Sequence, residues 1–299
     1  MNSIDIESKK FLGQPKNFVS IFNALLFDGK QVLKPEYLKD ENSELVMNVS
    51  SKHVDIIKRY EDGTYLDLFV IESQSYVDPS MVARVMEYES IARMRYIRQN
   101  FKNHVPISTR LPMILTVVLY VGESKWNAAK RLSELEIIHP GFEAMFNEFQ
   151  LNLIELNTNH KYNTGEKATQ DFFDLLSMIY RKQILKEDLD REFNRDALYF
   201  AYVVTKNKEL LSIYNKSEKG DVKVCRALDE MFEESTNKGI QMGIKQGFEQ
   251  GIEQGIVQGI ELNRFEVYQT MLDKGFSIKT IASIFSVSEE SIEKLLMKA

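Results

Sequence analysis

Two segments rich in apolar and β-branched residues, 54–61 and 64–74, flank the dipeptide Asp62-Gly63. Asp-Gly is suited to a two-residue type I′ turn, so this pattern predicts a β-hairpin. Both faces of the hairpin are largely apolar, which is typical of strands that are covered on two sides. We therefore expect the hairpin to be buried on both faces.

Acidic residues interrupt one face of this predicted hairpin. If Glu61 pairs with Thr64 across the turn, Asp55 and Glu72 become diagonal neighbours on one face, together with Gln74. Diagonal neighbours lie about 7–8 Å apart at the backbone, so both carboxylates can reach one ion. Buried carboxylates without a partner are costly, which favours a metal site formed by Asp55 and Glu72. The alternative is two acids at strand ends that merely reach solvent.

The opposite face of the hairpin carries a third acid, Asp67. The same register places Lys58 across from it, and cross-strand pairs of opposite charge are favourable. We therefore expect an ion pair there and exclude Asp67 from the site.

The segment before the hairpin shows weaker patterns. Helix-spaced apolar residues predict a helix over 17–27. Residues 1–16 are polar and predicted to be flexible, residues 31–43 are predicted to be a connection, and residues 44–49 are a candidate first strand.

The segment after the hairpin predicts a long helix and two strands. Asp78 is suited to the N-cap of that helix and Pro79 to its first position. The nearly continuous apolar run 111–121 predicts a buried strand, with Trp126 packing over its end, and residues 150–156 predict another strand. This order of elements predicts an α/β fold with a mixed sheet.

Basic residues gather toward the end of the predicted long helix. They are Arg93, Arg95, Arg98 and Lys102. A solvated helix end that is favoured by the helix dipole explains them, and so does a patch that contacts phosphate groups. Arg84 and Tyr88, one turn apart near the helix start, are better placed to reach the acidic site.

The only internal repeat has a period of four residues and spans 239–260. Its glycines are Gly239, Gly243, Gly247, Gly251, Gly255 and Gly259. Each is followed by an apolar residue, with mostly Gln, Glu and Lys between. Six glycines inside a helix cost on the order of 5–6 kcal/mol, so we expect a helix that requires a packing partner and makes the protein a homo-oligomer. The alternative is a mobile tether.

The patterns divide the chain into four predicted parts. They are a sheet-containing domain at 1–160, a helical subdomain at 161–236, the repeat helix at 237–262 and a small helical unit at 263–299. In the last unit Ser277 and Ser288 are predicted N-caps of two short helices, in the style of a helix-turn-helix. Basic residues there are balanced by glutamates, which favours a docking or oligomer cap over DNA binding.

The composition narrows the class of protein. The net charge of −6 over 299 residues argues against a polyanion binder, so contact with nucleic acid requires a local basic patch. The single cysteine, Cys225, excludes an intrachain disulfide, and the four histidines lack the spacing of zinc ligands. With no signal peptide and no apolar run long enough to span a bilayer, we expect a cytoplasmic protein without a membrane segment.

Several segments, in their order along the chain, resemble the Rpn-type family of recombination-promoting nucleases and transposases, within the PD-(D/E)XK nuclease superfamily. They are Phe22–Gly29, Val54–Ile57, Ile71–Ser75, Arg84-x-x-x-Tyr88 and the run Leu111–Gly122 with Trp126. The Gly-Ile-x-x repeat is also similar to what such proteins often carry. The likeness spans most of residues 17–160 and resumes in the tail.

This resemblance implies a restriction-endonuclease-like sheet flanked by helices, and cleavage of DNA at a divalent metal, Mg²⁺ or Mn²⁺. Asp55 and Glu72 match the catalytic and metal-binding acids. Gln74 stands where the superfamily usually has lysine. A glutamine can orient the attacking water by hydrogen bonds, but it cannot supply the positive charge of a lysine.

The resemblance further implies a DNA partner, and Arg84, Tyr88 and Arg95 are the candidate DNA contacts. The expected function is hydrolysis of phosphodiester bonds by a metal-dependent DNA endonuclease associated with recombination or transposition. The alternative is a catalytically silent DNA-binding or self-assembling protein that retains the nuclease fold.

Overall fold

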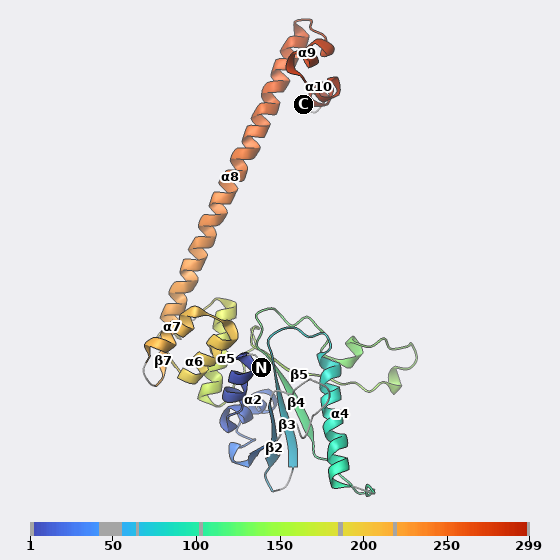
Figure 1. Cartoon of the computed structure of the whole chain (residues 1–299), viewed down its shortest axis with the longest axis vertical. Helices are drawn as coiled ribbons and strands as arrows, with labels where there is room; N and C mark the ends of the chain where they lie inside the picture. The colour runs from blue at the N-terminus through green and yellow to red at the C-terminus, as the bar shows by residue number, and fades with distance from the viewer. Residues whose placement is uncertain are drawn as a thin grey trace. The chain divides into compact units, whose positions relative to one another are not determined.

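A five-stranded mixed sheet forms the centre of the first part of the chain (Figure 1). The computed structural model describes residues 3–41, 56–63, 66–101, 104–184, 188–217 and 220–297. The sheet order is β1-β2-β3-β4-β5. The strands are β1 Leu38–Asp40, β2 Ile56–Glu61, β3 Leu66–Gln74, β4 Ile114–Tyr120 and β5 Asn152–Glu155. Antiparallel pairs join β1, β2 and β3, whereas β3, β4 and β5 are parallel, which confirms the predicted mixed sheet.

Helices cover both faces of this sheet, and they lie on either side of the strands in Figure 1. On one face, α4 (Met81–Asn100) packs Tyr88 and Ala92 against the strands. On the other, α2 (Pro15–Phe27) places the ring of Phe22 4.8 Å from that of Phe69. Both faces of β3 are therefore buried, as its apolar composition predicts.

The hairpin between β2 and β3 has a longer loop than predicted. Glu61 pairs with Leu66, not with Thr64, so the register differs from the expected one by two residues. Side chains alternate with a period of two, so this shift leaves Glu72 and Gln74 on the predicted face. Thr64 lies outside the described residues, as does Asp55.

The expected ion pair between Lys58 and Asp67 is absent because of this register. Lys58 pairs with Phe69, and its ammonium lies 2.5 Å from the carboxylate of Asp40 on β1. Asp67 instead accepts a hydrogen bond from the backbone N–H of Met113 at 3.1 Å, and burial raises its pKa. Asp67 lies on the other face of β3 from Glu72.

The N-terminal segment is a helix rather than the flexible stretch predicted for residues 1–16. Helix α1 spans Ser3–Leu12, with Phe11 and Leu12 buried. The ring of Phe11 stacks 5.0 Å from Phe200 and lies 5.6 Å from Phe172. These partners lie far along the chain, so the local polar pattern could not reveal the packing.

The first strand also differs from its prediction. The candidate segment 44–49 lies outside the described residues. The structure places β1 at residues 38–40, within the stretch predicted to be a connection, after a short 3₁₀ turn at Pro35–Tyr37.

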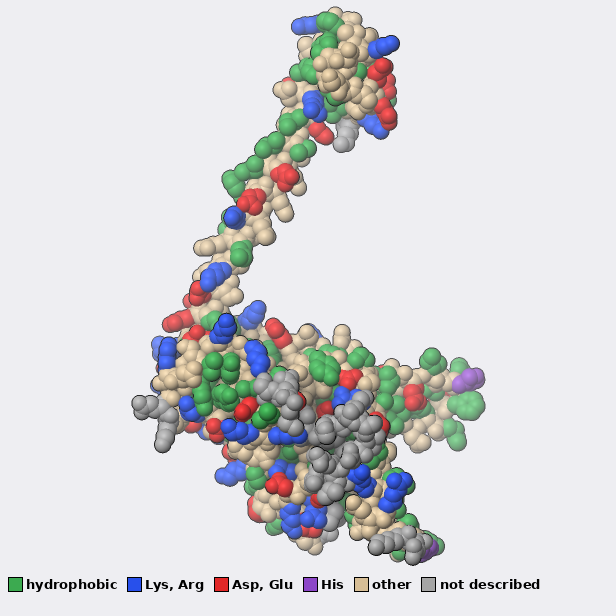
Figure 2. Space-filling model, in the orientation of Figure 1, with side chains coloured by type: hydrophobic (Ala, Val, Ile, Leu, Met, Phe, Trp, Pro, Cys, Tyr) green, Lys and Arg blue, Asp and Glu red, His purple; other side chains and the backbone are tan. Residues whose placement is uncertain are grey.

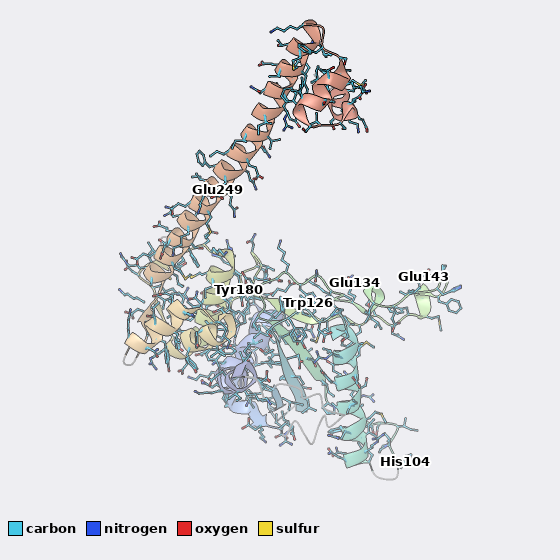
Figure 3. All side chains as sticks on the ribbon, turned by 45° about the horizontal axis from the view of Figure 1, so that its top comes forward. His104, Trp126, Glu134, Glu143, Tyr180 and Glu249 are labelled. Carbon is cyan, nitrogen blue, oxygen red and sulfur yellow. The ribbon has the colours of Figure 1, made fainter. Side chains whose placement is uncertain are left out.

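The remaining elements of the first part are mostly helical. They are η2 Leu132–Glu134, η3 Glu143–Met145, α5 Lys167–Arg181, β6 Glu192–Phe193, α6 Arg195–Thr205, α7 Lys208–Lys216 and β7 Val222–Lys223. Strands β6 and β7 pair antiparallel, a small sheet that the helical pattern did not predict. Residues 131–150 form a loop that is closed at its base by pairing of Arg131 with Gln150, and Glu134 and Glu143 mark this loop in Figure 3.

Two aromatic side chains fix the end of β4 (Figure 3). Trp126 packs edge-on against Tyr120 with ring centroids 5.1 Å apart, as predicted for the end of this strand. The hydroxyl of Tyr180 on α5 donates a hydrogen bond to the carbonyl of Val121. The helical segment is thereby tied to the sheet, and both belong to one compact unit, Met1–Glu230.

The second compact unit is Met231–Ala299. Helix α8 (Cys225–Asp273) contains the whole glycine repeat, and α9 (Ile278–Phe285) and α10 (Glu289–Met297) follow it. Tyr268 of α8 packs with residues of both short helices. Ser277 and Ser288 accept hydrogen bonds from the backbone N–H groups of Thr280 and Ser291, which confirms the predicted N-caps. Within the described ranges, every helix is too short or too polar to span a bilayer.

A buried carboxylate holds the helical segment together. Asp171 on α5 accepts hydrogen bonds from Lys167, Arg191 and the backbone N–H of Asn194, all at 2.7 Å, and its side chain is 2% exposed. Removal of one partner from a buried ion pair leaves the other charges uncompensated.

We expect Asp171→Asn to lower the free energy of unfolding by about 3 kcal/mol, measured by urea denaturation. The matched control is Asp190→Asn. Asp190 pairs with Arg226, and both side chains are more than two-thirds exposed. Loss of such a surface pair costs at most about 1 kcal/mol. Equal losses in the two variants would contradict a stabilising role for the Asp171 network.

Candidate functional site

Two buried polar side chains stand at the C-terminal end of β3. Glu72 and Gln74 are each 4% exposed and share one face of the sheet. They pair with Val118 and Tyr120 of the parallel neighbour β4. A charged residue buried in a strand of this kind requires a compensating partner, because its desolvation is costly.

The partner of Glu72 is Arg84 on α4. One guanidinium nitrogen, Nη2, donates to Glu72 Oε1 at 2.8 Å. The other, Nη1, donates to Asp78 Oδ2 at 2.5 Å, and Nε and Nη2 donate to the Tyr88 hydroxyl at 3.0 and 2.8 Å. Arg84 thus joins two carboxylates and a hydroxyl in one cluster.

The electrostatics of this cluster favour the charged state of Arg84. Burial alone would lower its pKa, but hydrogen bonds to Asp78 and Tyr88 and the charge of Glu72 outweigh that effect and raise it. The pKa of Tyr88 is raised, mainly by burial and then by the charge of Glu72. Tyr88 therefore stays a neutral hydrogen-bond partner.

The start of α4 positions Arg84. The helix begins at Met81 with Ser80 at its N-cap, two residues later than the predicted start with Asp78 as N-cap and Pro79 as first residue. Asp78 Oδ1 accepts hydrogen bonds from the backbone N–H and hydroxyl of Ser80 at 2.8 and 2.7 Å. One carboxylate oxygen therefore holds the helix start, and the other holds Arg84.

Gln74 is fixed by the chain that follows it. Its Nε2 donates to the carbonyl of Tyr76 at 3.0 Å, and its backbone carbonyl accepts from Val121 N–H at 2.8 Å. The chain after β3 and the chain after β4 approach each other so closely at Gly122 that a Cβ there would collide with the Tyr120 hydroxyl and the Ser75 carbonyl. The carbonyl of Tyr76 therefore orients the amide of Gln74.

The candidate DNA contacts do not all gather at this point. Arg84 and Tyr88 lie at Glu72, but Arg84 is 14% exposed and committed to partners. Arg95 is two to three turns further along α4, where it lines a separate hollow of about 300 Å³ with Arg59 and Leu68. Arg84 and Tyr88 therefore belong to the Glu72 cluster, and Arg95 lies apart from it.

Sequence reasoning missed the part of Asp78 in this cluster. It assigned Asp78 only to the helix start. Six residues separate Asp78 from Arg84, so the i,i+3 and i,i+4 spacings of helical pairs gave no signal for this contact.

The predicted pairing of Asp55 with Glu72 lies outside the described residues, so it remains a prediction. Among the described positions, no group of three or more His, Cys, Asp and Glu side chains is placed so that it could hold a metal ion. The donor chemistry present nevertheless fits a hard divalent cation. The carboxylate of Glu72 supplies oxygen ligands of the kind that Mg²⁺ and Mn²⁺ prefer.

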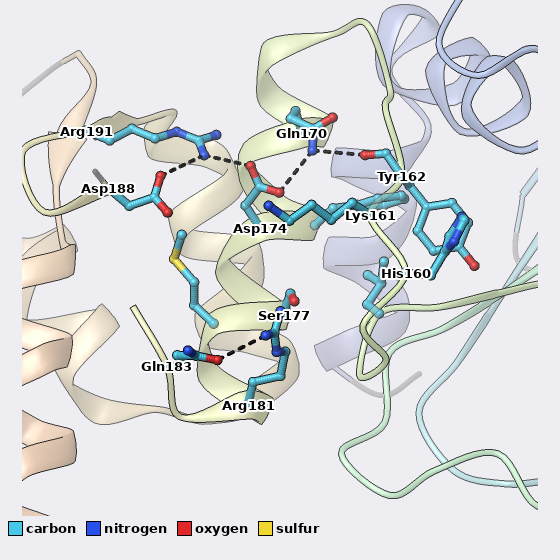
Figure 4. A pocket seen from close by; sticks show the side chains of 13 residues that line it. His160, Lys161, Tyr162, Gln170, Asp174, Ser177, Arg181, Gln183, Asp188 and Arg191 are labelled. Carbon is cyan, nitrogen blue, oxygen red and sulfur yellow. Dashed lines mark hydrogen bonds and ion pairs between the residues drawn. The ribbon is translucent and has the colours of Figure 1, made fainter. Parts of the chain in front are cut away.

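A second pocket, of about 250 Å³, lies beside α5 (Figure 4). Its acids Asp174 and Asp188 pair with Arg191, with the nearer contact at 2.7 Å. Gln170 donates both to Asp174 and to the carbonyl of Tyr162. Gln170, Asp174, Asp188 and Arg191 are thus bound to one another or to the backbone, which indicates a packing role for them. The cluster at Glu72 remains the candidate site.

Comparison with protein families gave one match, at residues 9–210, to the family described as "Putative transposase, YhgA-like". The match covers more than half of the chain, including the whole sheet and the cluster at Glu72. Comparisons with curated proteins and with solved structures gave no match.

The Asp78 carboxylate predicts a pH dependence of stability. Burial tends to raise its pKa, but hydrogen bonds from Ser80 and Arg84 lower it below the ordinary aspartate value. A lowered folded-state pKa stabilises the fold above the unfolded-state pKa, and this contribution is lost as the pH falls through the folded-state value.

We therefore expect the free energy of unfolding to fall between about pH 4 and pH 2 by more in the wild type than in Asp78→Asn. Urea denaturation at several pH values measures the difference. Asp190→Asn, which changes an exposed aspartate, serves as the control. Identical pH profiles for wild type and Asp78→Asn would contradict the assigned role of Asp78.

Proposed function

The chain belongs to the YhgA-like transposase family, the Rpn and PD-(D/E)XK-like group indicated by its motifs, and on this premise we propose that it is a metal-dependent DNA endonuclease. The observation that carries the proposal is the buried pair Glu72 and Gln74 on one face of β3, at the C-terminal end of a strand. A polar pair at such a strand end, within an otherwise apolar core, is typical of a site rather than of packing.

In this proposal Glu72 and Asp55 bind the metal, Mg²⁺ or Mn²⁺, through carboxylate oxygens. The bound ion would supply positive charge that stabilises the developing negative charge on the phosphate. Gln74 orients the attacking water. Its Nε2 already donates to Tyr76, so one N–H and the carbonyl oxygen of the amide remain for that task.

Arg84 and Tyr88 are the proposed neighbours of the DNA backbone at this site. Hydrolysis forms a bond from the water oxygen to phosphorus and breaks one phosphate ester bond. Gln74 carries no charge, unlike a lysine at this position. The positive charge that stabilises the phosphate must therefore come from the metal and from the guanidinium of Arg84. Arg95, on the same helix, is the proposed contact with a more distant phosphate.

A catalytically silent DNA-binding or self-assembling protein is the second candidate. The observation that favours it is the ion pair between Arg84 and Glu72, because the guanidinium occupies a carboxylate oxygen that would otherwise bind the metal. Metal binding that depends on Glu72, together with cleavage of DNA, supports the endonuclease. Absence of both supports the silent protein.

We expect Glu72→Gln and Asp55→Asn each to reduce Mg²⁺-dependent plasmid nicking by at least about 100-fold without loss of the fold. Gln74→Ala is expected to reduce nicking by about tenfold or more while metal affinity changes little, since no ligand charge is lost. Glu89→Gln is the matched control. Glu89 is also a buried glutamate of the α4 layer, but it pairs with Arg93 and the Thr116 backbone N–H. Nicking by Glu72→Gln at the wild-type rate would refute the assignment.

We further propose that the glycine repeat of α8 mediates self-association. The apolar residue after each glycine is 47–68% exposed, and no atom beyond the helix lies within 4 Å of the glycine Cβ positions. Figure 2 shows these apolar side chains along α8. Each glycine destabilises an isolated helix by about 1 kcal/mol, so the helix needs a partner. The apolar side chains form a ridge beside the groove that the glycines leave. In a dimer with two-fold symmetry, the ridge of each copy packs into the groove of the other.

We expect the double variant Ile244→Gln and Phe248→Gln to weaken self-association by at least about tenfold in dissociation constant. Light scattering over a range of protein concentrations measures it. The control changes Met242 and Val257 to Gln, which removes two exposed apolar side chains that do not follow a glycine. A monomeric wild type, or equal weakening in both double variants, would make the repeat only a linker.

A further inference from the structure

The guanidinium of Arg84 lies between two carboxylates, at the place where the proposed function puts a divalent cation. Its Nη2 contacts Glu72 Oε1 and its Nη1 contacts Asp78 Oδ2. The side chains of Glu72 and Arg84 are 5% and 14% exposed, and that of Asp78 is 15% exposed. At such burial, water compensates little for a charge that loses its partner.

We propose that Arg84 is a built-in counter-ion that competes with the metal for Glu72, and that Asp78 is the positioning residue that retains Arg84 when Glu72 binds the metal. The inference rests on the proposed metal site at Glu72. It assigns to Asp78 a part in metal loading that is separate from its hydrogen bonds at the start of α4.

The hydrogen bonds of Arg84 divide into two groups. One group consists of the contact from Nη2 to Glu72, which metal binding would replace. The other consists of Nη1 to Asp78 and of Nε and Nη2 to the Tyr88 hydroxyl at 3.0 and 2.8 Å, and none of these involves Glu72. Arg84 can therefore leave Glu72 and still keep two anchors. The cation then remains beside the site, where it can face a phosphate.

The charges of the cluster also favour the departure of Arg84 from Glu72 when a metal binds. Two carboxylates share one guanidinium, so Glu72, Asp78 and Arg84 together carry a net charge of −1. Arrival of a divalent cation at Glu72 repels Arg84, whereas Asp78 continues to attract it. Without Asp78, the ion pair with Glu72 would be the only one left to Arg84 within this cluster, and Arg84 would compete harder for that carboxylate.

The test is a double-mutant cycle on metal affinity, measured by titration calorimetry with Mn²⁺ on the full chain without DNA. Arg84→Gln is expected to bind Mn²⁺ about tenfold more tightly than wild type, and Asp78→Asn about tenfold more weakly. In the Arg84→Gln background, Asp78→Asn is expected to change affinity by less than about threefold, because its effect acts through Arg84. Purely long-range charge effects would instead be additive in the cycle.

Arg93→Gln is the matched control. It removes a guanidinium from the same helix that also pairs with a buried glutamate, Glu89, at 2.8 Å. Its Mn²⁺ affinity is expected to equal that of the wild type. Where Arg84→Gln does not fold, as judged by urea denaturation, Arg84→Lys replaces it and is expected to tighten binding, because an ammonium lacks the two-pronged contact of the guanidinium. Tyr88→Phe removes an anchor of Arg84 and is expected to weaken binding, as Asp78→Asn does.

The outcomes separate this inference from the proposed function. If Glu72→Gln binds Mn²⁺ as tightly as the wild type, the proposed site is wrong. If binding depends on Glu72 but Arg84→Gln does not tighten it, or the cycle is additive, the metal site stands and the counter-ion inference is overturned.

Discussion

The parallel pairing of β3 with β4 is the constraint on which the arrangement of the site depends. Parallel neighbours cannot be joined by a tight turn, so the chain must cross a face of the sheet between Gln74 and Ile114. Helix α4 lies in that crossover, and it covers the face that carries Glu72. The connection that the topology demands therefore also brings a guanidinium to the buried carboxylate.

This arrangement joins stability to the proposed chemistry. Glu72 is tolerated in the core because Arg84 neutralises it, and Arg84 is held in turn by Asp78 and Tyr88. The same contacts that make the buried acid tolerable also restrict its availability to an external cation. In the proposed function, the same neighbours would both preorganise the site and limit its metal loading.

Local patterns determined much of this fold. The period of two placed Glu72 and Gln74 on the right face even though the loop length, and with it the register, was wrong. Asp-Gly favoured the shortest turn, but pairing of Glu61 with Leu66 requires a longer loop. Helix α1 and the link from Asp78 to Arg84 depend on contacts between residues that the pattern does not relate. Asp55 lies outside the described residues, and its pairing with Glu72 rests on the sequence alone.

The packing of α1 has a consequence for biosynthesis. Phe11 completes its contacts with Phe172 and Phe200, which leave the ribosome about 160 and 190 residues later. At translation rates of about 5–20 residues per second, this interval is roughly 10–40 seconds. During that time the apolar side of α1 has no native partner from these aromatic residues. The nascent chain therefore carries the Phe11 side chain without these aromatic partners for longer than the sheet hairpin needs to form, and chaperones can act in this interval.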